Sequence, residues 1–383
     1  MNLTNMARGI KYPQNNPVTG LRNHAQCYIV PPVLLKKIIE ETQDSQLRRR
    51  LMRSLEFSTR ARTERKFASA VQAVLAEPPA LGTVPKKHRY VYDVRHKSDP
   101  GLPGKLVRNE GQPPTNDSDV DKAYDNSGHT WDFYYDVFKR VSINNKNISL
   151  RSCVHYEEDL DNAMWNGTYM IYGDGGGGFI KKGTLTNLDV CGHELTHGVT
   201  ENESNLEYFG EMGGLNEGFS DIFGAMIQQK VNNQDVDHAS WLIGEGIIEE
   251  DAVGNARALR DMKDPGTAFD GDSQISKYED FDPSMDPHTS SGIPNKAFYL
   301  TCKEIGGKSW EKAGMIWYVA LRDTVKQYSQ FIDVANSTYA LAGQLFKDEP
   351  NIQKAVKKGW EGVGISPKPH TINEAIKVSP RFT

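Results

Sequence analysis

The spacing of apolar residues divides this chain into a strand-containing first half and a mainly helical second half. Alternation of apolar and polar residues predicts a strand over 89–94, and two further apolar runs, 152–156 and 168–172, are expected to pair as strands. Helical spacing predicts helices over 33–75, 119–141, 213–229, 296–302, 309–327, 331–345 and 352–363. The pattern therefore predicts an α+β fold with a mixed first lobe, a helical second lobe and a cleft between them.

The first 80 residues form a leader that differs in character from the rest. Residues 1–26 are polar and aperiodic, and residues 27–35 are apolar and contain Pro31 and Pro32. Because proline lacks an amide hydrogen and restricts its neighbour, the two prolines are expected to keep this segment extended and not helical. A cluster of arginines then makes the leader basic, and Pro78-Pro79 marks a linker. A basic segment can bind nucleic acid or membrane, but docking on an acidic body is the preferred interpretation.

Composition narrows the class of protein. The chain has 383 residues with 38% hydrophobic and 25% charged residues, which suits a globular protein of two lobes with a short accessory segment. Its net charge of −5 gives no reason to expect nucleic acid or a membrane as partner, and a monomer is expected. The four cysteines have no CxxC spacing. The N-terminus lacks the apolar core of a secretory signal, so we expect a cytoplasmic protein or export by a non-standard route.

One stretch carries metal chemistry. Residues 189–199 are expected to be helical, and His193 and His197, four residues apart, then share a face and can hold one Zn²⁺. Glu194 lies beside them without being needed as a ligand. Downstream, Glu217 and Asp221 repeat the four-residue spacing, so that Glu217 can supply the third ligand while Asp221 reaches behind the site. A histidine pair alone is more often surface or capping chemistry, but this combined pattern indicates a zinc endopeptidase.

Further motifs give the chain a family resemblance from about residue 89 to 364. They are Asn-Ala-Met-Trp-Asn-Gly at 162–167, Tyr-Gly-Asp-Gly at 172–175, Tyr208, Gly-Leu-Asn-Glu at 214–217, Arg260 before Asp264-Pro265, and His-Thr-Ser-Ser-Gly-Ile at 288–293. With the His193–His197 motif, they make the chain resemble the thermolysin-like neutral metalloproteases. The segment Val-Pro-Pro-Val-Leu at 30–34 also resembles the short propeptide of protealysin-like precursors. The expected organisation is a propeptide and linker over 1–80, a catalytic lobe with the histidine helix over 81–202, and a helical lobe over 203–383.

The resemblance implies a role for each matching residue. One catalytic zinc, held by His193, His197 and Glu217, leaves a position for water whose proton Glu194 accepts. Tyr208 and His288 would stabilise the oxyanion, while Asp221 and Asn216 would orient His193 and His197 respectively. The remaining assignments concern a protein or peptide substrate: Asn162, Ala163 and Trp165 on its backbone, Arg260 on the carbonyl beside the scissile bond, and Val190, Ile243, Leu259 and Phe179 around a large apolar side chain after that bond.

Two departures from the family pattern change the expectations. Pro283 stands where the family has the aspartate that orients the oxyanion-stabilising histidine, so Asp286 or Asp282 is expected to take over that role. Of the residues at the family's paired calcium site, only Asp189 and Glu245 are acidic, and the others map to Gln228, Ser240 and Leu242. Because Ca²⁺ requires six to eight oxygen ligands, a double site is not expected, and at most one weakly bound ion is.

The leader is expected to inhibit the enzyme within the same chain. Pro31 and Pro32 could lie along the cleft, where proline is a poor residue at a scissile position. Cys27 either places a thiolate on the zinc or is an ordinary shielded thiol. Two other functions compete with the latent endopeptidase: a catalytically silent, zinc-stabilised binding protein, and a zinc aminopeptidase. Neither explains the pattern as well, because binding alone does not require Glu194, Tyr208 and His288, and no acidic groups are placed to hold a free amine.

Overall fold

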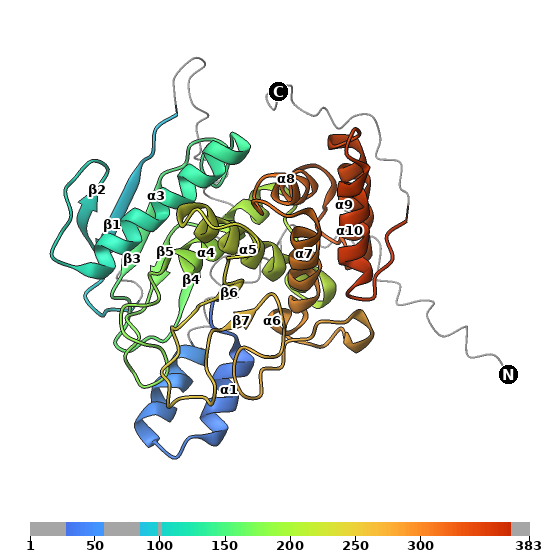
Figure 1. Cartoon of the computed structure of the whole chain (residues 1–383). Helices are drawn as coiled ribbons and strands as arrows, with labels where there is room; N and C mark the ends of the chain where they lie inside the picture. The colour runs from blue at the N-terminus through green and yellow to red at the C-terminus, as the bar shows by residue number, and fades with distance from the viewer. Residues whose placement is uncertain (1–27, 57–84, 99–101, 369–383) are drawn as a thin grey trace, which may run out of the picture.

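The computed structural model describes residues 28–56, 85–98 and 102–368. The chain runs from a strand-containing lobe on the left of Figure 1, through two central helices, to a helical lobe on the right. The expected α+β architecture with two lobes is confirmed. Among the described residues, no helix combines the length and apolar character needed to cross a membrane.

The first lobe is built on a five-stranded sheet in the order β2-β1-β3-β5-β4. Its strands are β1 (Arg89–Asp93), β2 (Lys105–Asn109), β3 (Leu150–Val154), β4 (Ala163–Trp165) and β5 (Met170–Tyr172). The central pairs β1·β3 and β3·β5 are parallel. The β3·β5 pair confirms that the second and third predicted strands pair with each other. The antiparallel edge strands β2 and β4 were not predicted, because β2 lies in a stretch rich in proline and glycine and β4 has only three residues. The long helix α3 (Ser118–Phe138) packs beside the sheet. Its N-cap is Asp117, whose carboxylate accepts hydrogen bonds from backbone amides of the first turn.

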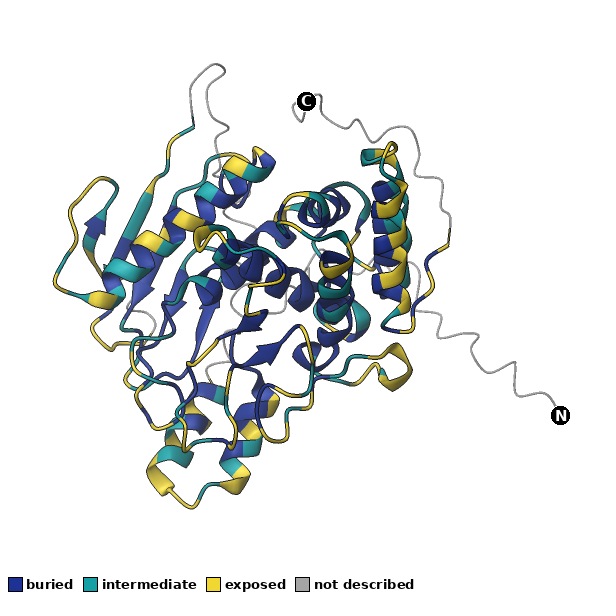
Figure 2. Ribbon diagram, viewed as in Figure 1, coloured by how far each residue is buried: buried dark blue, intermediate teal, exposed yellow. Residues whose placement is uncertain are grey.

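Two buried helices cross at the centre of the molecule. They are α4 (Leu188–Glu203) and α5 (Gly210–Val231), and Figure 2 shows both as almost wholly buried. Small residues allow their close approach: a Cβ atom on Gly192 would lie 2.9 Å from Ile227, and one on Gly224 would lie 3.0 Å from the carbonyl oxygen of Asp189. This contact brings the histidine helix against the helix that carries Glu217.

The second lobe consists mainly of helices. They are α6 (Pro287–Ser290), α7 (Gly292–Ile305), α8 (Lys312–Val319), α9 (Phe331–Leu345) and α10 (Pro350–Glu361), with a 3-10 turn at Tyr278–Asp280 and the short strand pair β6 (Leu242–Ile243) and β7 (Arg260–Asp261). The boundaries predicted for α9 agree with the structure. The single helix predicted over 309–327 was wrong, because a π-helical turn at Ala320–Thr324 follows α8 and the chain then becomes extended at Val325.

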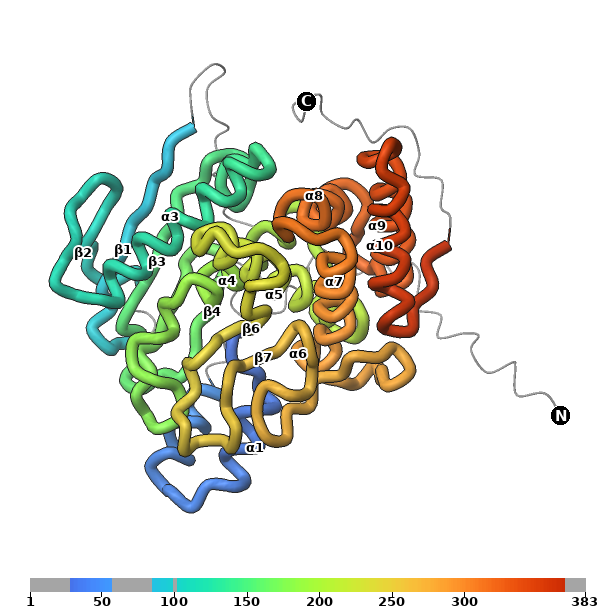
Figure 3. The backbone as a smooth tube through the Cα atoms, in the orientation of Figure 1, coloured from blue at the N-terminus to red at the C-terminus, as the bar shows by residue number. Residues whose placement is uncertain are grey.

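The leader packs against both lobes. It contains α1 (Pro32–Glu41) and a second helical segment over residues 45–56, both at the bottom of Figure 3 beneath β6, β7 and α6. The expectation that both prolines prevent a helix was wrong for Pro32, because the first helical position needs no amide donor. The continuous helix predicted from residue 33 is also interrupted at 42–44. Residues 1–27, including Cys27, and the predicted linker lie outside the described residues.

Candidate metal centre and substrate cleft

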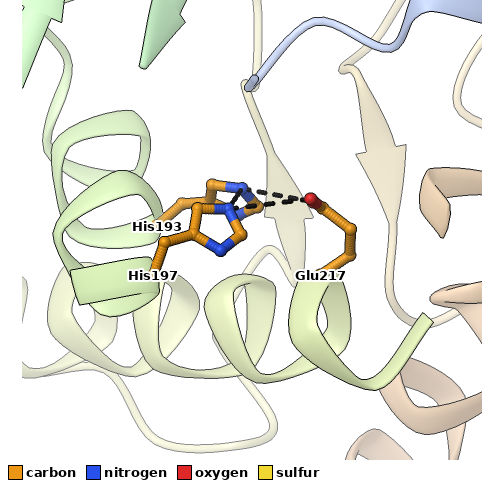
Figure 4. A group of neighbouring side chains, drawn as sticks. All are labelled: His193, His197 and Glu217. Carbon is orange, nitrogen blue, oxygen red and sulfur yellow. Dashed lines mark hydrogen bonds and ion pairs between the residues drawn. The ribbon is translucent and has the colours of Figure 1, made fainter. Parts of the chain in front are cut away.

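Three side chains converge where α4 crosses α5. Figure 4 shows His193 and His197 projecting from α4 toward Glu217 on α5. The two Nε2 atoms are 3.0 Å apart, and they lie 3.4 and 3.7 Å from the carboxylate oxygens of Glu217. Donor atoms bound to one tetrahedral zinc at about 2.0–2.2 Å stand roughly 3.3–3.6 Å apart, so this group fits the ion. All three side chains are buried.

The opposite ring nitrogens are held by the protein. The Nδ1 atom of His193 lies 2.8 Å from Asp221, and Nδ1 of His197 lies 2.9 Å from Asn216 Oδ1. The Asn216 amide nitrogen donates to the Leu206 carbonyl, which fixes the oxygen toward His197. With Nδ1 donating to these oxygens, both Nε2 lone pairs face the same point, an arrangement that a cation stabilises. Ser220 also lies 2.9 Å from His197 and was missed in the sequence.

Asp221 is the hub of a buried charge network. Besides His193, it accepts hydrogen bonds from the guanidinium of Arg260 and, at 2.8 Å, from the amide of Asn295. Burial raises the pKa of Asp221, but Arg260 and His193 outweigh that effect and hold it at about 2. Arg260, expected only on the substrate, therefore also anchors the residue that orients a zinc ligand. Asn295 lies 74 positions away in the chain and carried no sequence signal.

The remaining catalytic candidates surround the same point. The backbone amide of Trp165 donates to Glu194 Oε2 at 2.9 Å, and the substrate-binding role expected of Trp165 stays a prediction. The Tyr208 hydroxyl donates to Glu217. His288 Nδ1 lies 2.7 Å from Asp286, whereas Asp282 accepts hydrogen bonds from Ser284. Of the two acids considered for orienting His288, the one in contact is Asp286.

The leader backbone forms hydrogen bonds with the side chains expected to hold a substrate. His288 Nε2 lies 2.7 Å from the carbonyl oxygen of Tyr28, and Arg260 donates to the carbonyl of Ile29 at 2.9 Å. The Ile29 amide donates to the Ala163 carbonyl at 3.3 Å. Asn162 accepts from the Val30 amide at 3.1 Å and donates to its carbonyl at 3.4 Å. The contact segment is thus Tyr28–Val30, which precedes the two prolines.

The residues expected to line the apolar pocket are all buried. Val190, Ile243, Leu259 and Phe179 belong, with Ile29 and Val30 of the leader, to the main hydrophobic core of the molecule. Pro31 lines a cavity with Leu259, Arg260 and His288. The leader thus lies beside Leu259, one of the predicted specificity residues.

The two acidic residues at the calcium-site positions, Asp189 and Glu245, lie in different environments. Asp189 is buried and accepts a hydrogen bond from the Gly244 amide at 2.6 Å, while Glu245 is exposed. Burial raises the pKa of Asp189 despite that hydrogen bond. The expectation of no double calcium site stays a prediction.

Comparison with known proteins identifies the family. The model of the thermolysin metallopeptidase catalytic domain matches residues 83–201, and that of the thermolysin metallopeptidase alpha-helical domain matches residues 204–365. This chain belongs to the thermolysin metallopeptidase family. An extracellular metalloprotease of Pectobacterium carotovorum subsp. carotovorum is 38% identical over 361 residues, covering 90% of this chain and 98% of the relative. A thermolysin of Bacillus sp. (strain EA1) is 34% identical over 72% of this chain, which spans only 50% of that relative.

A solved structure extends the likeness to the leader. The precursor of protealysin, a metalloproteinase from Serratia proteamaculans, is 37% identical, with a TM-score of 0.77 over 89% of this chain and 100% of that one. The resemblance to a protealysin-like precursor is confirmed. The thermolysin family is zinc-dependent, and His193, His197 and Glu217 are the residues of this metallopeptidase that fit the ion.

A second polar cluster in the metallopeptidase was not predicted. His155 Nδ1 lies 2.7 Å from Asp174, and Nε2 lies 2.9 Å from Asp117, with Asp119 and His96 close by. The hydrogen bond to Asp174, reinforced by that to Asp117, raises the pKa of His155 to about 9 against the opposing effect of burial. Because both ring nitrogens contact carboxylates, the geometry suits an imidazolium.

We expect this imidazolium to make folding stability depend on pH. The folded-state pKa of about 9 exceeds the unfolded value near 6.5, so the stabilisation is complete below pH 6.5 and is lost as pH rises through 9. The free energy of unfolding should fall by about 2 kcal/mol more over this range in the wild type than in His155→Gln. Urea titrations at several pH values measure this difference. His238→Gln, at an exposed histidine paired with Asp235, is the control and should retain the wild-type slope.

Proposed function

We propose that this metallopeptidase is a zinc-dependent endopeptidase made as a latent precursor, with its own leader as the inhibitor. The observation that carries the proposal is the path of the leader backbone. The leader backbone at residues 28–30 forms hydrogen bonds with His288, Arg260 and Asn162, in that order along the chain. The family resemblance assigns these three side chains to a substrate. A substrate cannot use the same groups while the leader is docked.

The contacts also suggest the register of a substrate. In the family assignment, His288 faces the scissile carbonyl and Arg260 the following one. By analogy, the Tyr28 carbonyl occupies the scissile position and Ile29 the position after the bond. Ile29 is buried in the same hydrophobic core as Val190, Ile243 and Leu259, and the nearby Pro31 lines a cavity with Leu259. This apolar environment supports a preference for a large apolar residue after the scissile bond.

The chemistry follows from the groups around that carbonyl. Zn²⁺, when bound by His193, His197 and Glu217, supplies Lewis-acid polarisation and makes water a better nucleophile near neutral pH. Glu194 accepts the proton of the attacking water and returns it to the leaving amine, and the Trp165 amide keeps its carboxylate in place. His288, oriented by Asp286, donates to the oxyanion, and Tyr208 is expected to turn from Glu217 to assist it.

Several contacts away from the metal hold the leader in place. Lys37 on α1 donates to the Asp270 carbonyl at 2.7 Å, and Arg50 donates to the Gly177 carbonyl at 3.0 Å. Arg50 also pairs with Asp159 at 3.0 Å, and an ion pair this exposed adds about 1 kcal/mol at most. Most of the affinity therefore comes from the backbone hydrogen bonds and from the buried apolar residues Ile29, Val30 and Leu35.

We expect release of the leader to expose the cleft to a substrate-like inhibitor. Full-length Glu194→Ala protein, which cannot process itself, is cut in the linker near Pro78-Pro79 and freed of the leader in mild denaturant. A zinc-binding peptide hydroxamate with a leucine side chain should bind the freed protein about 100-fold more tightly than the uncut chain, since docked leader reduces the competent fraction. Calorimetry measures both affinities.

Equal affinities before and after release would refute latency. Active wild-type protein tests the hydrolysis itself: peptide cleavage that a zinc chelator abolishes distinguishes the endopeptidase from a silent binding protein. Cys27→Ser in the wild-type chain tests the thiolate hypothesis separately, because unchanged latency would remove only the role of Cys27.

A further inference from the structure

A buried carboxylate lies beside the cleft and has no role in the chemistry above. Asp161 immediately precedes Asn162 and is 0% exposed. Neither carboxylate oxygen makes a hydrogen bond of normal geometry, although the Ile180 amide and Arg50 lie close enough to favour the charged form. Burial nevertheless raises its pKa to about 7, with Asp159 and Glu249 adding to the rise. A buried carboxylate is normally stabilised by a hydrogen-bond donor or a cation, and the precursor provides no hydrogen bond of normal geometry to this one.

The leader covers this acid and presents a basic side chain to it. The Asp161 amide donates to the hydroxyl of Ser54, itself buried, at 3.2 Å. A Cβ atom on Gly177 would lie 3.2 Å from Asp161 Oδ2 and 3.1 Å from Arg50 Cδ, so the Arg50 side chain and the carboxylate flank the same glycine. Arg50 is also paired with Asp159, two residues before Asp161. When the leader leaves, the Asp161 amide loses Ser54, and the carboxylate loses the nearby positive charge of Arg50.

The position of the acid relates it to one residue of a bound peptide. Asn162 holds both the amide and the carbonyl of Val30. In the register derived above, Val30 stands where the second residue after the scissile bond would lie. A side chain at that position therefore belongs to the residue that Asn162 holds, and Asn162 directly follows Asp161 in the chain.

We propose that Asp161 is a specificity-determining residue, which selects a lysine or arginine side chain at the second position after the scissile bond. The inference rests on the proposed function, because the register comes from it. In the precursor, Arg50 of the leader supplies positive charge near the carboxylate, while its own ion pair is with Asp159. A substrate cation restores the counter-charge that leader release removes, in a partly desolvated site where a charge pair is stronger than in water.

Binding of two matched inhibitors tests the assignment without requiring hydrolysis. Two peptide hydroxamates, identical except for lysine or norleucine at the second position after the scissile bond, are bound to leader-released Glu194→Ala protein at low salt. We expect the lysine compound to bind about tenfold more tightly, and the ratio to fall toward one as salt is raised. In Glu194→Ala/Asp161→Asn the ratio should be close to one at all salt concentrations, and Asp161→Glu should restore part of it.

A charge-matched control separates this site from the general field of the protein. Glu250→Gln removes an exposed carboxylate on another loop and should leave the tenfold ratio intact. A ratio of one in the parent protein, or a tenfold ratio that survives Asp161→Asn, would overturn the assignment. Loss of the ratio in Glu250→Gln would overturn it as well. Failure of the proposed function gives a different result, namely no chelator-sensitive cleavage by the active enzyme, while the affinity ratio still decides the role of Asp161.

Discussion

Replacing Glu194 with glutamine is expected to lower the turnover of a peptide substrate by about 100- to 10,000-fold while zinc remains bound. Glu194 contacts the Trp165 amide and is not one of the three grouped donors, so its loss removes a proton acceptor and leaves the ligands intact. Glutamine keeps an acceptor for that amide, whereas Glu194→Ala leaves a buried donor unpaired at a cost of about 1–3 kcal/mol. Turnover is measured on protein freed of its leader, together with the zinc content.

Glu217→Ala is the matched variant, because it removes a carboxylate from the same centre but should lose zinc and activity together. Zinc-free Glu194→Gln protein, or turnover within about tenfold of wild type, would contradict the assignment of Glu194 as the base. The comparison also separates the proton-transfer role from a ligand role, which activity measurements alone cannot do.

Asp221→Ala is expected to destabilise the fold by about 3–5 kcal/mol, since it leaves the buried Arg260 guanidinium without its carboxylate. The same change removes the acceptor that orients His193, so zinc affinity should fall by roughly 10- to 100-fold. Urea unfolding in the presence of chelator measures the first effect without interference from metal loss. Competition with a zinc indicator measures the second effect in the absence of chelator.

Asp282→Ala provides the control for stability, because the Asp282 carboxylate is exposed and accepts hydrogen bonds from the nearby Ser284. It should change the free energy of unfolding by no more than about 0.5 kcal/mol. A loss below about 1 kcal/mol for Asp221→Ala would mean that Arg260 finds another partner or water, and that the network is not a structural unit.

The Asp221–Arg260 pair connects the metal centre with the cleft. One end of the pair meets His193 Nδ1, and the other donates to the Ile29 carbonyl. Anything bound at the Ile29 position therefore contacts a group that also fixes a zinc ligand. The leader and a substrate would compete for this same guanidinium, which is why leader docking and catalysis exclude each other in the proposed function.

Local spacing in the sequence was enough to place each pair of candidate residues on one helix face. His193 and His197, like Glu217 and Asp221, lie four residues apart, and helix geometry places such pairs on one face whatever the rest of the fold does. Periodicity likewise located α9, a helix with one apolar side. These features were predictable because each depends on backbone geometry within a few turns, whereas Glu217 joins the two histidines only because α5 crosses α4.

Other features depended on packing between distant segments. The choice of Asp286 over Asp282 follows from a loop in which Asp286 precedes α6 and accepts from the His288 amide and ring. Strands of two or three residues, such as β4 and β7, have no usable period and form only because neighbouring elements supply their partners.

The leader shows the same division most clearly. Its basic character and its prolines were visible in the sequence, but the residues that enter the cleft are Tyr28–Val30, and Pro32 begins a helix. The hydrogen bond from the Asp161 amide to the Ser54 hydroxyl joins positions 107 residues apart. Residue spacing alone shows which groups share a helix face, because covalent geometry sets that spacing. Which distant surfaces meet depends instead on the summed burial and hydrogen bonding of the whole chain, and so became visible only in the folded protein.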